Sequence, residues 1–333
     1  MKKILIIRLA ALGDTLHTTP CLKALKEAYP KSSLTYIVGK GAEPVIENNP
    51  YIDEIIIFDK RGNHKTWSSQ IRLALYLRKK NFDIVANMSP STRTLTFSFI
   101  INGDKKLLYR RDKEPDRGVK AAHAVENCWA TFDSLRIKYD KTALIPQFFI
   151  THAEKETVSK LIASIGITGK DKIIGINPGA SHQVNRWDAN SFALLSDRLI
   201  RDLKTKIIIV GGPSDIEIAS SIENKMEETP VNLAGKLSIR ESAALFERCC
   251  VFVTGDTGPM HIAAAAGVPV VALFGAADPD RTGPVGRRHI IIQKKDLECV
   301  PCRKRVCSKN HECMKDITVD EIFAACGRAI NIL

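Results

Sequence analysis

The sequence predicts an α/β protein built from two parallel sheets, each with helices on both faces. Short apolar runs rich in valine and isoleucine alternate with amphipathic helical stretches, an order typical of βαβ units. Glycine-containing polar turns follow several of these runs, as at the carboxyl ends of parallel strands. The pattern restarts near the middle of the 333 residues, which suffice for two domains. We expect two Rossmann-like, doubly wound domains, residues 1–160 and 161–333, that face each other across a cleft.

In the first half of the chain, the apolar runs predict five strands with helical stretches between them. The first helix is expected to open at Asp14 and to end before Pro30. The expected strands are Lys2 to Leu9, Leu34 to Val38, Ile55 to Phe58, Asp83 to Asn87 and Lys106 to Tyr109. The expected helices are Asp14 to Ala28, Gly39 to Asn49, Ile71 to Lys80, Thr92 to Ile100 and residues 121–136, with a charged loop at Arg110 to Gly118.

The second half repeats this order after a boundary between residues 150 and 170. The expected strands are Ile173 to Asn177, Lys206 to Val210, Val251 to Thr254, Val270 to Phe274 and Ile290 to Gln293. The expected helices are Glu154 to Ser164, Asn190 to Leu203, Ile216 to Met226, Ile239 to Cys249, a short one after Pro259, and Val319 to Asn331. One option is that the terminal helix packs back on the N-terminal domain.

Composition is that of a globular protein, with 44% hydrophobic and 26% charged residues. No run of about 18 uninterrupted apolar residues occurs, so no membrane span is expected. Arg8 interrupts the apolar run at the N-terminus and no small-residue cleavage site follows, so this run predicts a strand rather than a signal peptide. We expect a cytoplasmic protein, whose nine cysteines are reduced thiols.

The charge distribution is uneven. The formal net charge is +12, and residues 60–120 carry 15 lysines and arginines against 5 acidic residues. Such a patch suits nucleic acid, an anionic membrane surface or a polyanionic substrate, and a solvated basic surface is the alternative. Aromatic residues make up 6%, are not interleaved regularly with the basic ones, and accompany no recognition motif. These features argue against a nucleic-acid-binding module.

The clearest functional signal is the polar turn after the strand that ends at Thr254. Glycines flank Asp256 and Thr257 there, and the amides of the following helix are free to meet an anion. Asp256 could cap that helix, shape a phosphate site, or do both. His261 lies four residues after Thr257, on the same helix face, and could point to the phosphates or be a satisfied core histidine. Gly258 lets the backbone approach the ligand.

Two further loops follow strands of the same half, Asn177 to Ser181 and Val210 to Asp215. Ser181 offers a hydroxyl donor to a phosphate, and Asp215 could accept hydrogen bonds from ribose hydroxyls. No Walker loop and no G-x-G-x-x-G after a strand occurs. The pattern therefore favours a mononucleotide diphosphate over NAD binding or ATP hydrolysis.

The matching turn in the first half contains Asp14, directly after Gly13. Asp14 could be a helix N-cap or a general base that deprotonates an acceptor hydroxyl. His17, one turn later, would be structural or would contact the substrate. Arg8 lies on an otherwise apolar strand, so it must reach the sheet edge or be paired, and it could contact an anionic acceptor.

Four cysteines lie close together near the C-terminus. Their spacing is Cys299-x₂-Cys302-x₄-Cys307-x₅-Cys313, with His311 beside them. A structural zinc site, oxidation-prone pairs and unligated thiols in a packed loop are the three readings of this segment. Only one C-x₂-C pair is present, which argues against a zinc ribbon.

With these motifs, the sequence resembles the ADP-heptose:lipopolysaccharide heptosyltransferases, glycosyltransferase family 9, and most of all heptosyltransferase II. The resemblance covers nearly the whole chain and rests on four segments in order: Ile4 to Pro20, Asn177 to Trp187, Gly255 to Gly267, and Cys299 to Met314. It implies a GT-B fold in which the N-terminal domain binds the acceptor and the C-terminal domain binds the nucleotide sugar.

The resemblance also implies an activity. It is an inverting transfer of heptose from ADP-heptose to an anionic lipopolysaccharide core, without metal or other cofactor, at the inner membrane face. Asp14 then matches the general base, and Arg8 and His17 are expected at the acceptor. The donor contacts implied for this chain are Ser181, Arg186, Asp215, Leu237 (at the adenine), Asp256, Thr257, Gly258 and His261.

The chain departs from the family pattern at one position. The family carries Lys-x-Trp, whereas Asn185 precedes Arg186 and Trp187 here. Either Arg186 substitutes with altered geometry, or catalysis is weaker, or the donor differs, because arginine is no simple replacement for lysine at a point-charge site. The alternatives are a GT-B transferase that uses another nucleotide sugar, or a nucleotide-sugar epimerase.

Overall fold

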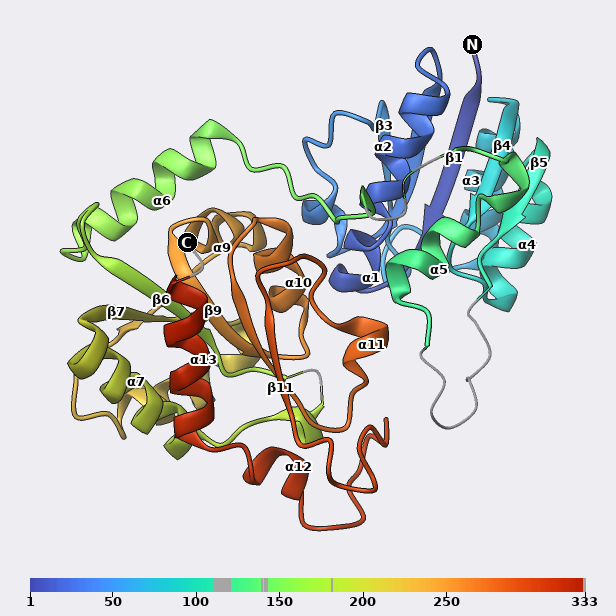
Figure 1. Cartoon of the computed structure of the whole chain (residues 1–333). Helices are drawn as coiled ribbons and strands as arrows, with labels where there is room; N and C mark the ends of the chain where they lie inside the picture. The colour runs from blue at the N-terminus through green and yellow to red at the C-terminus, as the bar shows by residue number, and fades with distance from the viewer. Residues whose placement is uncertain (111–120, 139, 141–142, 181, 332–333) are drawn as a thin grey trace. The chain divides into compact units, whose positions relative to one another are not determined.

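The computed structural model describes residues 1–110, 121–138, 140, 143–180 and 182–331, and the chain divides into two compact units, Met1–Phe149 and Ile150–Leu333 (Figure 1). The sequence placed the boundary near residue 160. The structure places it earlier because helix α6 (His152–Ser164) packs against helix α9 (Ile239–Phe246). Helix α6 is therefore the first element of the second unit.

The first unit contains a five-stranded sheet in the order β3-β2-β1-β4-β5. All its strand pairings are parallel, so the expected α/β class is confirmed. Its strands are β1 (Lys3–Arg8), β2 (Ser33–Gly39), β3 (Glu54–Phe58), β4 (Phe82–Asn87) and β5 (Gly103–Leu108).

Helices α3 and α4 lie side by side on one face of this sheet (Figure 1). Ala74 and Leu77 of α3 and Phe97 of α4 pack with apolar side chains of β1, β2 and β4 to form its core. The helices of the unit are α1 (Leu12–Leu16), α2 (Thr19–Ala28), α3 (Trp67–Arg78), α4 (Thr92–Ile100) and α5 (Ala124–Ala130), with 3₁₀ turns at Glu43–Val45 and Asp133–Leu135.

The single helix expected from Asp14 to Ala28 is divided in two. Helix α1 ends at Leu16, and α2 begins at Thr19. The Thr19 hydroxyl donates to the Leu16 carbonyl at 2.9 Å. Pro20 has no amide proton with which to continue the ladder to the same carbonyl, so the first helix cannot run through this point.

The second unit contains a six-stranded parallel sheet in the order β11-β10-β9-β6-β7-β8. Its strands are β6 (Lys172–Asn177), β7 (Thr205–Ile209), β8 (Val231–Asn232), β9 (Cys249–Gly255), β10 (Val270–Phe274) and β11 (Ile290–Gln293). Besides α6 and α9, its helices are α7 (Ala189–Leu203), α8 (Ile216–Glu223), α10 (Gly258–Ala265), α11 (Pro279–Thr282), α12 (Glu312–Lys315) and α13 (Val319–Asn331).

The terminal helix α13 packs on the sheet of the second unit. It contacts β9, β10 and β11 and lies beside α7 (Figure 1). Its apolar side chains Ile322, Ala325, Cys326 and Ala329 are buried in the core of that unit. This position differs from the option that the helix returns to the N-terminal domain, because its apolar face is already used. Among the described residues, no helix is both long and apolar enough to cross a bilayer.

Both sheets share one topological feature. In each, the first strand lies inside the sheet, the next two strands extend it on one side, and the fourth strand starts the other side. The strand order therefore reverses between β1 and β4 in the first unit and between β6 and β9 in the second. Loops at the carboxyl ends of such strand pairs diverge and leave room for a ligand.

Candidate functional site

In the second unit, side-chain hydrogen bonds connect the loops that follow three adjacent strands. The Asn177 amide at the end of β6 donates to the Val210 carbonyl after β7 at 3.2 Å. On its other side, the Thr254 hydroxyl of β9 donates to the Asn177 amide oxygen at 3.4 Å. Thr254 and Thr257 share a hydrogen bond of 3.1 Å between their hydroxyls. The three loops predicted to hold phosphate and ribose are thus joined at the strand-order reversal.

Asp215 ends the loop that follows β7, and glycines of this loop and of the loop after β6 make room for its side chain. A Cβ atom on Gly179 would lie 2.6 Å from an oxygen of the Asp215 carboxylate, and one on Gly211 would lie 2.7 Å from the Asp215 Cβ. The Gly212 amide donates to the same carboxylate at 2.9 Å. The half-buried carboxylate is therefore fixed at the carboxyl edge of the sheet, where it keeps lone pairs free for a ligand.

In the turn after β9, the structure decides between the two roles considered for Asp256. The N-cap of α10 is Thr257, whose hydroxyl accepts from the Met260 amide at 3.4 Å, so Asp256 is not the cap. Within the described part of the chain, the half-buried Asp256 carboxylate has no hydrogen-bond or ion-pair partner. Burial raises its pKa to about 6, from an ordinary value of 3.8. A perturbed carboxyl group at this edge of the sheet is a candidate functional group.

Asn185 has a structural role in the same region. Its side-chain oxygen accepts from the amide of Ala276, after β10, at 3.2 Å, and its own backbone packs against Gly255. Trp187 is buried and donates from its indole to the Ile317 carbonyl at 3.0 Å. Between them, Arg186 is exposed and forms no ion pair with any described residue. The positive charge in this loop therefore comes from Arg186.

The remaining predicted donor contacts have different environments. His261 is buried on α10, one turn after Thr257, and Gly258 is the first residue of that helix. Leu237 is half-buried between β8 and α9. The amide of Gly235, which precedes it at a φ of +73°, donates to the Gly211 carbonyl at 2.9 Å. Ser181 lies outside the described residues.

In the first unit, Arg8 holds Asp14 through two contacts. Its Nη2 lies 3.3 Å from an Asp14 carboxylate oxygen, and its Nε donates to the Asp14 carbonyl at 3.2 Å. Its Nη1 donates to the Met88 carbonyl, so the buried guanidinium joins the ends of β1 and β4. The N-cap of α1 is Ala11, which makes no side-chain cap, so Asp14 is not an N-cap either.

Arg8 and Asp14 border a cavity of about 1500 Å³. It lies at the carboxyl ends of all five strands of the unit. Among the side chains that line it, the charged ones are Arg8, Asp14, Lys40, Asp59, Lys60, Arg61 and Arg93. Cations outnumber carboxylates here, which favours an anionic ligand. His17 is not in this lining, since it is buried with its ring 5.5 Å from that of His123.

The model of glycosyltransferase family 9 (heptosyltransferase) matches residues 70–312. The chain belongs to this family. Lipooligosaccharide heptosyltransferase 2 of Campylobacter jejuni is 28% identical to this glycosyltransferase over 94% of each chain. The structure of a family 9 glycosyl transferase from Veillonella parvula has a TM-score of 0.90 at 28% identity and covers 100% of this chain and 98% of that one. The structure of E. coli ADP-heptose lps heptosyltransferase II has a TM-score of 0.80 at 22% identity and covers 100% of this chain and 99% of that one.

These relatives support the GT-B assignment, in which a chain has two Rossmann-like domains. The family match begins after Asp14 and includes Asp215 and Asp256. In this glycosyltransferase, the candidate residues of the second unit were predictable from their place after strands. Lys40 and Asp59, whose side chains pair at 2.7 Å in the cavity of the first unit, were not predicted. Asp59 directly follows a predicted strand, so the same rule could have found it, whereas Lys40 falls inside the helix predicted from Gly39 to Asn49.

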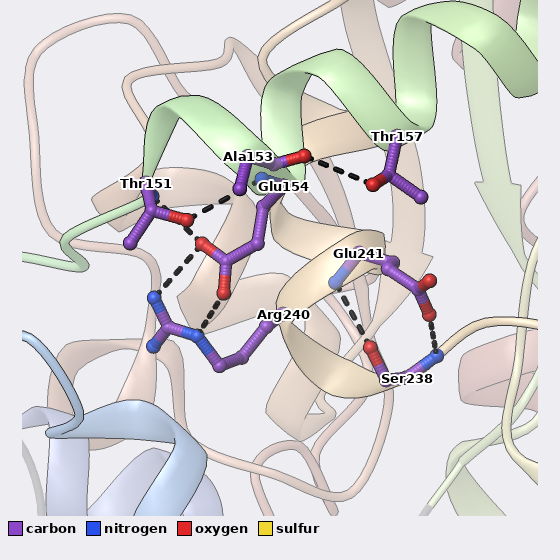
Figure 2. Close-up of polar contacts among 7 residues, drawn as sticks. All are labelled: Thr151, Ala153, Glu154, Thr157, Ser238, Arg240 and Glu241. Carbon is purple, nitrogen blue, oxygen red and sulfur yellow. Dashed lines mark hydrogen bonds and ion pairs between the residues drawn. The ribbon is translucent and has the colours of Figure 1, made fainter.

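A buried ion pair holds the start of α9, just after Leu237. Arg240 donates from Nη2 to the Glu154 carboxylate of α6 at 3.0 Å, and its Nε donates to the other oxygen (Figure 2). Burial alone would raise the pKa of Glu154, but hydrogen bonds from Arg240 and Thr151 outweigh it and lower the pKa. Ser238 and Glu241 cap the same helix end reciprocally (Figure 2). The loop that contains Leu237 is thus anchored.

The four clustered cysteines lie near the Asn185 loop, since Val184 and Ala276 line the same small cavity as they do. With His311 they line a cavity of about 20 Å³. Burial and the neighbouring thiols raise the pKa of Cys313 to about 11. In the described ranges, no three histidine, cysteine, aspartate or glutamate side chains are arranged to hold a metal ion, and all nine cysteines are free thiols.

Proposed function

We propose that this glycosyltransferase transfers heptose from ADP-heptose to the inner core of lipopolysaccharide, with inversion at the anomeric carbon and without a metal ion. The names of its relatives, lipooligosaccharide heptosyltransferase 2 and ADP-heptose lps heptosyltransferase II, support the sugar and the acceptor class. The observation that carries the donor assignment is the joining of three loops at the strand-order reversal of the second unit, with the carboxylates of Asp215 and Asp256 on two of them.

The donor binds to the second unit in this proposal. Asp215 accepts hydrogen bonds from the ribose hydroxyls, and the backbone near Leu237 meets the adenine. The amides at the start of α10 receive the diphosphate, since a helix N-terminus favours an anion. The side chains that surround the diphosphate and the heptose are Ser181, Arg186, Asp256, Thr257 and His261, with Gly258 beside them. Arg186 offsets the charge that develops on the departing ADP.

The acceptor binds to the first unit, and Asp14 is the catalytic base. Its carboxylate takes the proton from an acceptor hydroxyl as that oxygen attacks the anomeric carbon of heptose. The bond from that carbon to the diphosphate oxygen breaks, and ADP leaves. A single displacement of this kind inverts the configuration. Arg8 acts as a positioning residue, because it forms an ion pair with the Asp14 carboxylate and donates a hydrogen bond to the Asp14 carbonyl.

The acceptor's own negative groups have partners in the cavity of the first unit. Lys40, Lys60, Arg61 and Arg93 line it, and such side chains bind phosphates and carboxylates. His17 lies in the interior with its ring 5.5 Å from that of His123, and it contributes to the acceptor region without lining the cavity. Because the proposed acceptor is part of a lipid, we also propose that the enzyme works from the cytoplasm, in peripheral contact with the inner face of the membrane.

A thermal-shift titration tests the donor assignment. A ligand that binds only the folded protein raises its melting temperature, by an amount set by its affinity. ADP and ADP-heptose should raise it, whereas UDP and GDP at the same concentrations should not. Arg186→Gln should reduce the ADP shift, and Arg201→Gln, an exposed arginine of α7 that pairs with Glu227, should not. A shift with UDP alone would assign the enzyme to another nucleotide sugar.

A further inference from the structure

Six large apolar side chains of the first unit project into solvent from α3 and α4. Their exposed fractions run from 41% for Ile71 to 81% for Phe99. The six are Trp67, Ile71, Leu75 and Tyr76 on α3, and Leu95 and Phe99 on α4. A surface helix of a globular protein normally turns polar side chains outward, because its apolar stripe faces the core. Here the core side of both helices is also apolar, so the outer stripes need a separate explanation.

The two stripes form one surface. Trp67, Ile71 and Leu75 recur at every fourth residue and so lie on one face of α3, and Leu95 and Phe99 do the same on α4. The helices lie side by side (Figure 1), and the Arg78 side chain of α3 donates to the Ile100 carbonyl of α4 at 3.4 Å. We call these outer faces the α3–α4 surface.

The charges around the α3–α4 surface are mostly positive, and the exposed Asp104 of β5 is the one acidic residue on α3, α4 and β5. Neither helix contains an acidic residue, and the exposed cations on them and on β5 are Arg72, Arg78, Arg93, Lys105 and Lys106. The ammonium group of Lys106 lies 5.3 Å from the centre of the Phe99 ring and donates to the Phe99 carbonyl at 3.0 Å. Helix α6 contrasts with this pattern, since its exposed Lys160 pairs with Glu156 at 2.7 Å. An apolar surface with a basic border fits a partner that is apolar inside and anionic outside.

The α3–α4 surface is continuous with the cavity proposed for the acceptor. Thr92 and Arg93, at the start of α4, line that cavity. Lys60 and Arg61 line it as well, in the segment that leads into α3. Helix α4 therefore starts at the rim of the cavity, and α3 begins five residues after the lining segment that ends at Gly62. A bilayer against their outer faces would lie beside the entrance for a lipid-linked sugar.

We propose that the α3–α4 surface docks on an anionic lipid bilayer, with its apolar side chains between the headgroups and its arginines and lysines on the lipid phosphates. Amphipathic helices bind membranes in this way, through buried apolar area and attraction to anionic lipid. The proposal rests on the proposed function only for its consequence, which is that docking brings the cavity to a membrane-bound acceptor. The binding itself requires neither donor nor acceptor.

Vesicle flotation of the full chain, without any substrate, tests the proposal. Vesicles of phosphatidylcholine alone are compared with vesicles that also contain phosphatidylglycerol. The double variant Leu75→Gln/Phe99→Gln removes two exposed apolar side chains from the α3–α4 surface. The control is the double variant Leu194→Gln/Ile291→Gln, which removes two apolar side chains of the second unit that are 52% and 40% exposed. We expect wild type and control to bind phosphatidylglycerol vesicles more tightly than neutral ones. The α3–α4 variant should bind at least about tenfold more weakly, as two apolar side chains lose their burial in lipid.

Parallel measurements separate the docking surface from the proposed function. The α3–α4 variant should keep the circular dichroism, the ADP thermal shift and the transfer to a delipidated core acceptor of the wild type. Equal vesicle binding by wild type and variant would overturn the docking proposal. The docking proposal would also be overturned if the wild type did not bind vesicles and light scattering showed a wild-type dimer that the variant does not form. The α3–α4 surface would then be an interface with a second copy of the chain. A wild type that binds vesicles through this surface but transfers no heptose would refute the function alone.

Discussion

Replacing Asp256 by asparagine should stabilise the ligand-free protein at neutral and alkaline pH. Burial raises the pKa of this carboxyl from 3.8 to about 6 in the folded state, so the folded protein binds the proton more tightly than the unfolded chain. The free energy of unfolding therefore falls as pH rises from about 4 to about 6. At 1.36 kcal/mol per pH unit, the ionised carboxylate costs about 3 kcal/mol above that window. Asparagine keeps the shape and has no charge to bury.

Urea unfolding between pH 4 and pH 8 measures this effect. In a background with Trp67 and Trp129 changed to phenylalanine, the fluorescence of Trp187 reports the second unit. Asp256→Asn should be more stable than wild type by about 3 kcal/mol at pH 8 and by less than about 1 kcal/mol at pH 4. Asp296→Asn, at an exposed carboxylate, should change stability by less than about 0.5 kcal/mol. An asparagine variant no more stable than wild type at pH 8 would refute the reasoning.

Three other substitutions test separate parts of the account. Asp14→Asn should lower kcat by about a thousandfold, because the catalytic base is lost, and should leave the affinity for ADP unchanged. The control is Asp104→Asn, at an exposed aspartate of the same unit, which should keep the activity of the wild type. Glu154→Gln should lower the free energy of unfolding by about 2 kcal/mol at pH 7, because Arg240 loses its carboxylate partner. Folding lowers the pKa of Glu154, so this difference in stability should shrink as the pH falls below about 4. Equal stability of variant and wild type at pH 7 would contradict this. In calorimetric titrations, Arg186→Gln should weaken ADP binding by about tenfold, and unchanged affinity would remove Arg186 from the donor site.

The sequence was sufficient for the fold class because its signal is repeated. Each strand is an apolar run followed by a polar turn, so an error at one element does not alter the alternation of strands and helices. Errors occurred where a local contact decides the outcome. The helix expected from Asp14 to Ala28 is interrupted because the Thr19 hydroxyl donates its hydrogen bond to the Leu16 carbonyl, and the next residue, Pro20, has no amide proton to donate. No periodicity contains that information.

The candidate site was predictable to the level of strand ends and no further. The position after a strand indicated Asp14, Asp215 and Asp256, but whether Asp14 or Asp256 caps a helix depends on backbone angles within one or two residues. Asp14 lies inside α1, and Thr257 replaces Asp256 as the cap.

Other contacts join residues distant in sequence, and no local pattern could indicate them. The Asn185 side chain accepts a hydrogen bond from the backbone amide of Ala276, 91 residues later. The residue that stands in place of the family lysine therefore stabilises a neighbouring loop. The Arg8 guanidinium likewise reaches Met88, 80 residues away.

The stereochemistry of the transferred sugar tests the central proposal most directly. The purified enzyme is incubated with ADP-heptose and a delipidated lipopolysaccharide core acceptor, and the anomeric configuration of the product is read by NMR. We expect a heptosylated core whose anomeric configuration is opposite to that of the donor, with one ADP released per heptose transferred. We also expect no product with Asp14→Asn. A product of retained configuration, or full transfer by Asp14→Asn, would contradict the proposal.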